Sequence, residues 1–453
     1  MRLLPSRIPS LNVKLPAGLG RRSGQDLVGL DIQPGFVAAV RARVNGSIAA
    51  EHAATLSLPG DAMRDGEVVD EQALSEALRE LFSGSGLGKR VRVGVANQRT
   101  VLRTLEVPPV TDQKELAAAV NFQAQDQVPM PLGNAVMDFH PLGIVDTPAG
   151  PRQRVVLVAA QRDMIERLLS AVRHAGLSPE AVDLSAFALI RSLYRPDPDQ
   201  TGRVLYLNVD GLSNLAIAEG KICRFTRVVG SGMEGMASEL AERRSIAISE
   251  AREILAGVDL TAPSTSEGAP HEPAPATSSA DPSHMAEAPQ ADAPEADVAE
   301  SDADAAGASP PVEQASDEAA HVGAHAPVER DEESMSYEER AAIEAVEPVS
   351  VEQVSSSDPD VLAVIENGIR DISGEVRNSL DFHRSQDGGG DVSHVVLSGS
   401  VQDIPGFARA LQSSLGVEVR CQELAVVSAG ATETVSAHRL AVATGLAAAE
   451  APQ

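Results

Sequence analysis

The chain has 453 residues, of which 43% are hydrophobic, and this is enough for two or more packed domains. Its two cysteines, Cys223 and Cys421, stand far apart and outside any metal-binding spacing, which argues against a disulfide framework and a zinc site. The formal net charge is −28. The absence of tryptophan and the lack of a basic patch with interleaved aromatic residues argue against a nucleic-acid partner.

The first 26 residues are basic and contain no acidic residue before Asp26. They lack the continuous apolar core of a secretory signal, and no stretch of the chain approaches the roughly 18–20 apolar residues that span a bilayer. Residues 1–26 are therefore expected to be a flexible extension of a cytoplasmic protein.

A first folded unit is expected from residue 27. Short apolar runs separated by turn residues predict three strands, at 27–32, 36–44 and 47–58. Segment 70–82 has apolar residues at helical spacing, and segment 91–96 has the pattern of a further strand. The predicted order is β-β-β-α-β.

A small α+β insert is expected over about residues 97–173. Thr111 is predicted to cap the N-terminus of a helix that ends at Val128-Pro129. A strand is predicted at 135–140, a buried strand at 154–161, and then a helix that Gly176 stops.

The β-β-β pattern of the first unit recurs over residues 202–230, with Asp210-Gly211 at its first bend, where the first unit has Asp31. A repeated unit with an aspartate at its first bend resembles the actin-like, ribonuclease H-like ATPases. In that fold two lobes hold ATP between the two bends.

An acidic segment over residues 261–360 interrupts the second unit. It holds 24 acidic and two basic residues, a net charge of −22 that leaves only −6 for the rest of the chain. It also holds 12 of the 29 prolines and little apolar surface to offset chain entropy. It is predicted to be a disordered insertion, either an inert solubilising loop or a docking tail.

Several separated segments, in order, are similar to the type IV pilus assembly protein PilM family, relatives of the cell-division protein FtsA. They are "LPGDAMRDGEVVDEQAL", "QAQDQVPMP", "AVDLSAFALIRSL", "SHVVLSGSVQDIPGFARALQSSLGVEV" and "LAVATGLAAA". The resemblance covers about residues 27–257 and 361–448. It implies an α/β, actin-like (ribonuclease H-like) two-lobed ATPase fold with a small α+β insert subdomain.

The resemblance also implies a domain plan and partners. The first lobe would span 27–202, and the second 203–260 and 361–450. In the family, a groove between the first lobe and the insert binds the cytoplasmic tail of PilN, an inner-membrane protein. The chain is therefore expected to be a cytoplasmic scaffold at the inner membrane face, held there through a PilN-like partner and other pilus assembly components, with no nucleic acid.

The resemblance places a nucleotide, ATP with Mg²⁺, between the two bends. The residues that would line this cleft are Asp31, Gly35, Asp210, Gly211, Ser213, Gly230, Gly232 and Gly399. Asp31 and Asp210 would hold the metal through water. No catalytic residue is identified, and hydrolysis is not expected to be the function.

The phosphate and adenosine motifs depart from the family pattern. The departures are Gln33, Pro34 and Ala38 in the first bend, Leu212 in the second, Arg252 and Leu255 in the adenosine motif, and Ser400 in the last glycine pair. Glycine lets backbone N–H groups approach phosphates, and proline has no N–H to donate. The sequence therefore predicts weakened or lost ATP binding. The alternative to a metal-binding role for Asp31 and Asp210 is that both are ordinary turn residues.

Two other functions remain open at the level of sequence. A filament-forming, FtsA-like division protein shares the fold, although the sequence ends "AAAEAPQ" without a basic or aromatic anchor. A sugar-kinase-type phosphotransferase shares the two lobes, but no substrate-binding Asn/Asp motif is found.

Overall fold

The computed structural model describes residues 27–45, 47–60, 62–196, 202–261, 358–386, 388–422, 424–426 and 436–448. The predicted basic extension and nearly all of the predicted acidic insertion lie outside these residues. Their assignments therefore stay predictions.

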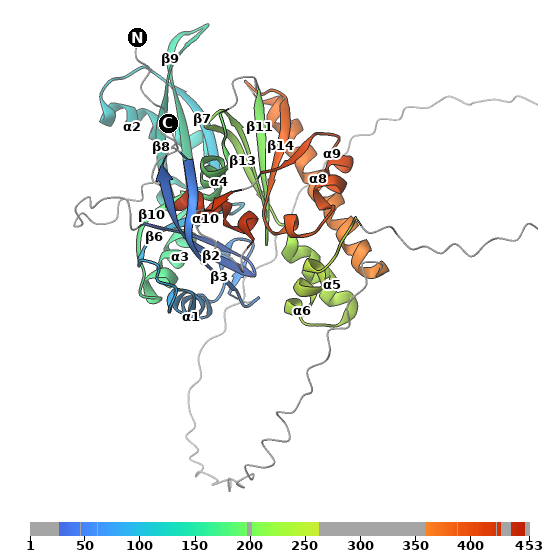
Figure 1. The fold of residues 1–453 in the computed structure, drawn as a ribbon. Helices are drawn as coiled ribbons and strands as arrows, with labels where there is room; N and C mark the ends of the chain where they lie inside the picture. The colour runs from blue at the N-terminus through green and yellow to red at the C-terminus, as the bar shows by residue number, and fades with distance from the viewer. Residues whose placement is uncertain are drawn as a thin grey trace, which may run out of the picture. The chain divides into compact units, whose positions relative to one another are not determined.

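A six-stranded sheet forms the first lobe, and its strand order is β10-β6-β1-β2-β3-β16 (Figure 1). Its strands are β1 (Val28–Gln33), β2 (Phe36–Asn45), β3 (Ser47–Ser57), β6 (Arg90–Val95), β10 (Ser178–Leu184) and β16 (Ala425–Val426). The strands expected from the sequence at 27–32, 36–44, 47–58 and 91–96 are confirmed. Every residue of β1 is buried, so this strand runs through the centre of the core.

The helix α1 (Glu71–Phe82) covers the first sheet together with α3 (Arg162–His174). The carboxylate of Asp70 accepts bonds from the backbone N–H groups of Gln72 and Ala73, which caps α1. Two short strands, β4 (Met63–Arg64) and β5 (Glu67–Val68), form a hairpin just before α1.

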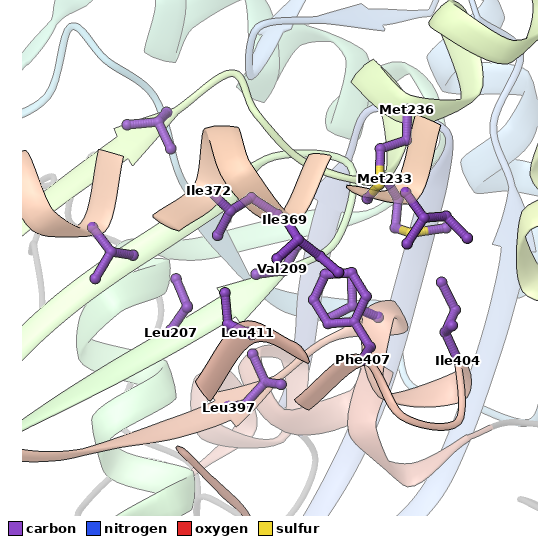
Figure 2. Close-up of a cluster of buried hydrophobic side chains, with 14 of the residues drawn as sticks. Leu207, Val209, Met233, Met236, Ile369, Ile372, Leu397, Ile404, Phe407 and Leu411 are labelled. Atoms are coloured by element: carbon purple, nitrogen blue, oxygen red, sulfur yellow. The ribbon is translucent and has the colours of Figure 1, made fainter. Parts of the chain in front are cut away.

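A five-stranded sheet forms the second lobe in the order β13-β12-β11-β14-β15. Its strands are β11 (Arg203–Val209), β12 (Ser213–Glu219), β13 (Ile222–Val229), β14 (Val392–Ser398) and β15 (Val419–Cys421). Its helices are α5 (Met233–Arg244), α6 (Ile248–Ala256), α8 (Pro359–Ser385) and α9 (Phe407–Leu415). Figure 2 shows their shared core, in which Phe407 lies among Val209, Ile369 and Ile404.

The two sheets share one pairing pattern, and this confirms that the unit is duplicated. In each, three antiparallel strands are followed by two strands that extend the sheet in parallel from the first one. The orders β3-β2-β1-β6-β10 and β13-β12-β11-β14-β15 are therefore equivalent. The first hairpin turn of each unit consequently occupies the same place in its lobe.

The insert is a three-stranded sheet in the order β7-β9-β8, packed against one helix. Its elements are β7 (Val101–Val107), α2 (Gln113–Gln127), η2 (Leu132–Asn134), β8 (Ala135–Thr147) and β9 (Gly150–Gln161). The prediction that Thr111 caps α2 is wrong, because Asp112 is the cap. Its carboxylate accepts bonds from the N–H groups of Lys114 and Glu115, which a side chain one residue earlier does not do.

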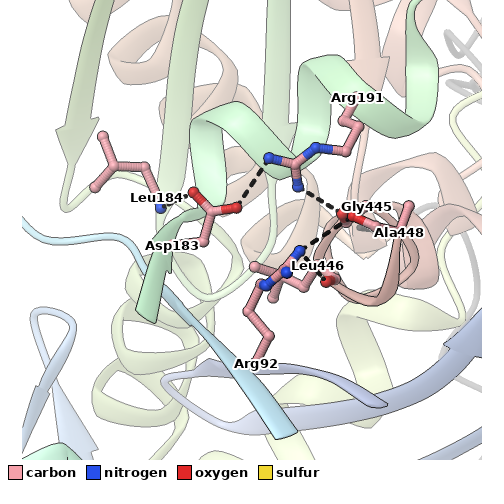
Figure 3. Close-up of polar contacts among 7 residues, drawn as sticks. All are labelled: Arg92, Asp183, Leu184, Arg191, Gly445, Leu446 and Ala448. Atoms are coloured by element: carbon pink, nitrogen blue, oxygen red, sulfur yellow. Dashed lines mark hydrogen bonds and ion pairs between the residues drawn. The ribbon is translucent and has the colours of Figure 1, made fainter. Parts of the chain in front are cut away.

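The last described helix returns to the first lobe. The short η5 (Ala437–Leu440) leads into α10 (Ala441–Ala447), which packs on β1, β2, β6 and α4 (Ser185–Leu193). Figure 3 shows how its C-terminal carbonyls are bound by two arginines. Arg191 donates to Gly445 O, and Arg92 donates to Leu446 O and Ala448 O, which satisfies acceptors that a helix end leaves without partners.

Candidate functional site

Two hairpin turns from the two lobes meet at the candidate site. In the first lobe Gln33 pairs with Phe36, so Pro34 and Gly35 form the turn, and Gly35 has a φ of 78° that favours glycine. In the second lobe the turn after β11 begins at Asp210 and continues through Gly211.

The two turns touch directly. A Cβ atom added at Gly211 would lie 2.3 Å from the carbonyl oxygen of Pro34. A Cβ atom added at Gly232, which precedes α5, would lie 2.7 Å from the carbonyl oxygens of both Asp210 and Gly211. Glycine is therefore required at both positions for the backbones to approach so closely.

Asp31 and Asp210 are both almost completely buried beside these turns. Asp31 Oδ1 accepts a bond of 3.2 Å from Gln33 Nε2, and within the described part of the chain Oδ2 has no partner. Burial, and then the negative charge of Asp210, raise the pKa of Asp31 to about 7. At neutral pH, Asp31 is therefore protonated in a large share of the molecules.

Asp210 is more fully bonded than Asp31. Its Oδ2 accepts from Asn208 Nδ2 at 2.9 Å, and its Oδ1 accepts from the backbone N–H of Ser400 at 2.6 Å. Burial raises the pKa of Asp210, and these hydrogen bonds act in the opposite direction. The carboxylate is therefore held by the second lobe itself.

A cavity of about 340 Å³ lies next to the two turns. Its walls include Gly35, Asp210 and Gly211 from the turns, together with Glu234, Arg252 and Arg439. Residues of the two predicted aspartate bends meet in the walls of this cavity.

Both arginines of this cavity are paired with carboxylates. Arg252 Nε and Nη2 lie 2.9 and 2.6 Å from the two carboxylate oxygens of Glu234. Arg439 Nε lies 3.0 Å from Asp403 Oδ2, and its guanidinium lies over the ring of Phe36 at 5.3 Å. The described cavity walls therefore offer no unpaired arginine or lysine to an anion.

Several backbone N–H groups near the cavity are also used internally. The Ser400 N–H donates to Asp210 Oδ1, the Gly399 N–H to His438 O, and the Met233 N–H to Asp210 O. Ala38, one of the departures from the family pattern in the first bend, is fully buried in an apolar cluster. Asp210 lines the cavity, whereas Asp31 is buried beside it and is not part of the walls. The paired arginines and these bonded N–H groups do not favour a triphosphate.

The other predicted site residues lie around the cavity rather than in it. Ser213 is buried, and its hydroxyl donates to Ser231 O. Gly230 lines a different cavity, and Gly399 packs against the backbone of Val209 with a φ of 97°. Sequence reasoning noted Arg252 only as a departure from a motif, and it missed Glu234 and Arg439 because their partners are distant in sequence.

A second feature is the junction between the first lobe and the insert. A Cβ atom at Gly66, in the β4–β5 hairpin, would lie 2.2 Å from Ala96 O, so this glycine allows a close approach. Asn97 Nδ2 donates to Asp65 O at 2.8 Å, and Arg99 pairs with Glu67 at 3.1 Å. These contacts fix the hairpin against the connection to the insert.

A large apolar side chain is exposed at this junction, next to buried apolar residues. The void of about 10 Å³ behind the hairpin, lined in part by Met63, Val68, Met164 and Leu168, has room for about one water molecule and is not a binding cavity. Val69, directly after β5, has 53% of its surface exposed, which is high for a large apolar side chain.

Comparison with known proteins identifies the fold. Residues 29–214 match the family model of the type IV pilus assembly protein PilM. A solved PilM-PilN type IV pilus biogenesis complex is similar with a TM-score of 0.61 and 19% identity, covering 93% of this chain and 97% of that chain. The resemblance to the PilM family and the predicted actin-like fold are therefore confirmed.

Two further solved structures are similar at lower scores. The ethanolamine utilization protein EutJ from Carboxydothermus hydrogenoformans has a TM-score of 0.43 and 13% identity, covering 93% of this chain and 88% of its own. MreB5 of Spiroplasma citri, bound to ADP, has a TM-score of 0.41 and 10% identity, covering 92% of this chain and 94% of its own.

Within the described residues, no helix combines the length and the apolar character needed to cross a membrane.

Proposed function

We propose, from the PilM pattern that residues 29–214 carry, that this chain is a scaffold of type IV pilus assembly that binds the cytoplasmic tail of a PilN-like membrane protein. The observation that carries the proposal is the similarity to the PilM-PilN complex over nearly the whole of both chains. Such a partner would hold the scaffold at the inner face of the cell membrane.

The tail is proposed to bind at the junction between the first lobe and the insert. This junction has a rigid hairpin, held by Asn97 and by the Arg99–Glu67 pair, and it exposes Val69 directly after that hairpin. A short apolar peptide could cover such a surface, because burial of apolar area favours association.

Titration with a synthetic peptide of a PilN-like tail tests this proposal. Val69→Glu is expected to weaken binding by about tenfold or more, since it places a charge on the apolar contact. Val44→Glu is the matched control, because Val44 is also an exposed valine, at 49%, but lies near the end of β2.

The two titrations separate the site from the function. If both variants bind the tail peptide as tightly as the wild type, the tail must bind at another surface. No binding of the tail peptide to the wild-type chain would overturn the scaffold proposal itself.

The same proposal includes weak or absent binding of Mg-ATP. The cavity arginines are paired, and the loop N–H groups are used within the chain, so a triphosphate would have to break these bonds before gaining its own. Calorimetry with Mg-ATP tests this, and a dissociation constant of about 1 μM or tighter would contradict it.

A further inference from the structure

We infer that this chain joins its two lobes with its own arginine–carboxylate pairs, in the cleft where actin-like ATPases hold a nucleotide. The inference rests on the proposed loss of tight Mg-ATP binding. It adds that side chains of the protein make the contacts between the lobes that a bound nucleotide would otherwise make. The pairs Arg252–Glu234 and Arg439–Asp403, which we call the internal clamp, surround the first-lobe turn Pro34–Phe36.

The first pair lies directly against the turn. A Cβ atom at Gly35 would lie 2.8 Å from Glu234 Oε2 and 2.9 Å from Arg252 Cζ, so the paired groups pack on the Gly35 backbone. Glu234 is in the first turn of α5 and Arg252 is in the middle of α6, so both belong to the second lobe. Each side chain is only 20% exposed, which reduces screening of the pair by water.

The second pair reaches the same turn from another direction. Arg439 belongs to η5, which packs against β2 of the first lobe, and its guanidinium lies over the Phe36 ring. Its ion-pair partner Asp403 is in η3 (Ser400–Asp403) of the second lobe. A cation–π contact and an ion pair on one side chain therefore join the two lobes.

The internal clamp holds the two turns in contact without an added ligand. Pro34 O already contacts the Gly211 backbone, as the absence of room for a Cβ atom shows. In a ligand-dependent cleft, negative phosphates would need unpaired cations and free N–H groups from both lobes. Here the positive charges of Arg252 and Arg439 are already matched by Glu234 and Asp403, so closure is a property of the chain alone.

Hydrogen–deuterium exchange on the full chain without nucleotide tests the clamp. In the variant Arg252→Gln/Arg439→Gln, backbone amides of segments 35–37 and 210–213 are expected to exchange about fivefold faster or more, because local opening costs less. The matched control, Arg243→Gln/Arg420→Gln, also removes two arginines that are paired with carboxylates, here Glu239 and Glu418 away from these turns. It is expected to exchange like the wild type there.

Addition of Mg-ATP to the wild type is expected to leave exchange at both segments unchanged. If the amides of these segments exchange in the clamp variant at the same rate as in the wild type, the clamp is disproved, whatever the result of the peptide titration. Slower exchange of the wild type with Mg-ATP would instead show that the cleft uses a ligand, which contradicts the proposed loss of nucleotide binding. If the double variant does not fold, Glu234→Gln alone provides the same comparison, because it leaves Arg439 and Asp403 in place.

Discussion

Arg191 and Asp183 form an ion pair with almost no contact with solvent: Nη2 lies 2.9 Å from Oδ2, and the side chains are 2% and 0% exposed. The other Asp183 oxygen accepts from the Leu184 N–H, and Arg191 also donates to Gly445 O in α10 (Figure 3). The pair thus links β10 and α4 to the last described helix.

Arg191→Leu is expected to reduce the free energy of unfolding by about 3–5 kcal/mol, because Asp183 would be left as a buried charge without compensation. Arg154→Leu is the control. Its partner Glu106 is also 2.9 Å away, but the two side chains are 35% and 40% exposed, and loss of such a pair costs about 1 kcal/mol or less. Urea denaturation measures both, and similar losses in the two variants would contradict the expectation.

Gly445→Ala is expected to destabilise the first lobe by several kcal/mol, or to prevent folding. An added Cβ atom would lie 1.9 Å from the carbonyl oxygen of Ala188, where the helices α10 and α4 cross. Gly374→Ala is the matched control, since Gly374 is inside α8 and its added Cβ would point into open space. It should stabilise the chain by about 1 kcal/mol, because alanine favours helix. Thermal unfolding distinguishes the two, and a Gly445 variant as stable as the wild type would show that α10 can move away.

Asp31→Asn is expected to stabilise the chain at neutral pH. The folded pKa of Asp31 is raised to about 7 from 3.8, so its cost is absent below about pH 4, grows as the pH rises, and is complete above pH 7. The asparagine removes this cost, with an upper limit of about 4 kcal/mol above pH 7. Unfolding curves from pH 4 to pH 8 measure it, and a gain that does not change with pH would disprove the assignment.

Replacing residues 266–351 by a short glycine–serine linker is expected to leave the melting temperature within a few degrees of the wild type. The acidic and proline-rich composition of this segment predicts little buried surface, and long surface insertions add little loop entropy. Differential scanning calorimetry measures the change. A fall equivalent to several kcal/mol would show that the segment packs against the rest of the chain.

The sequence by itself was sufficient for most of the elements and their repetition. Strands β1, β2, β3 and β6, the three strands β11–β13, the helix α1 and the stop of α3 at Gly176 follow from periodicity and turn residues, which depend on neighbours close in the chain. Strands β10, β14 and β15 were not predicted. The error in capping, in which Thr111 was predicted and Asp112 is the cap, also concerns neighbouring residues. Both residue types are good caps, and the backbone conformation decides between them.

Only the tertiary structure decided which side chains pair with one another at the candidate site. The sequence placed Asp31 and Asp210 at equivalent bends, but it did not predict that Arg252 would pair with Glu234 against Gly35, or Arg439 with Asp403 beside Phe36. Arg439 and Phe36 are about 400 positions apart, and no local pattern encodes a contact of that range. The sheets bring such groups together, because the first turn of each duplicated unit ends at the same edge of its lobe.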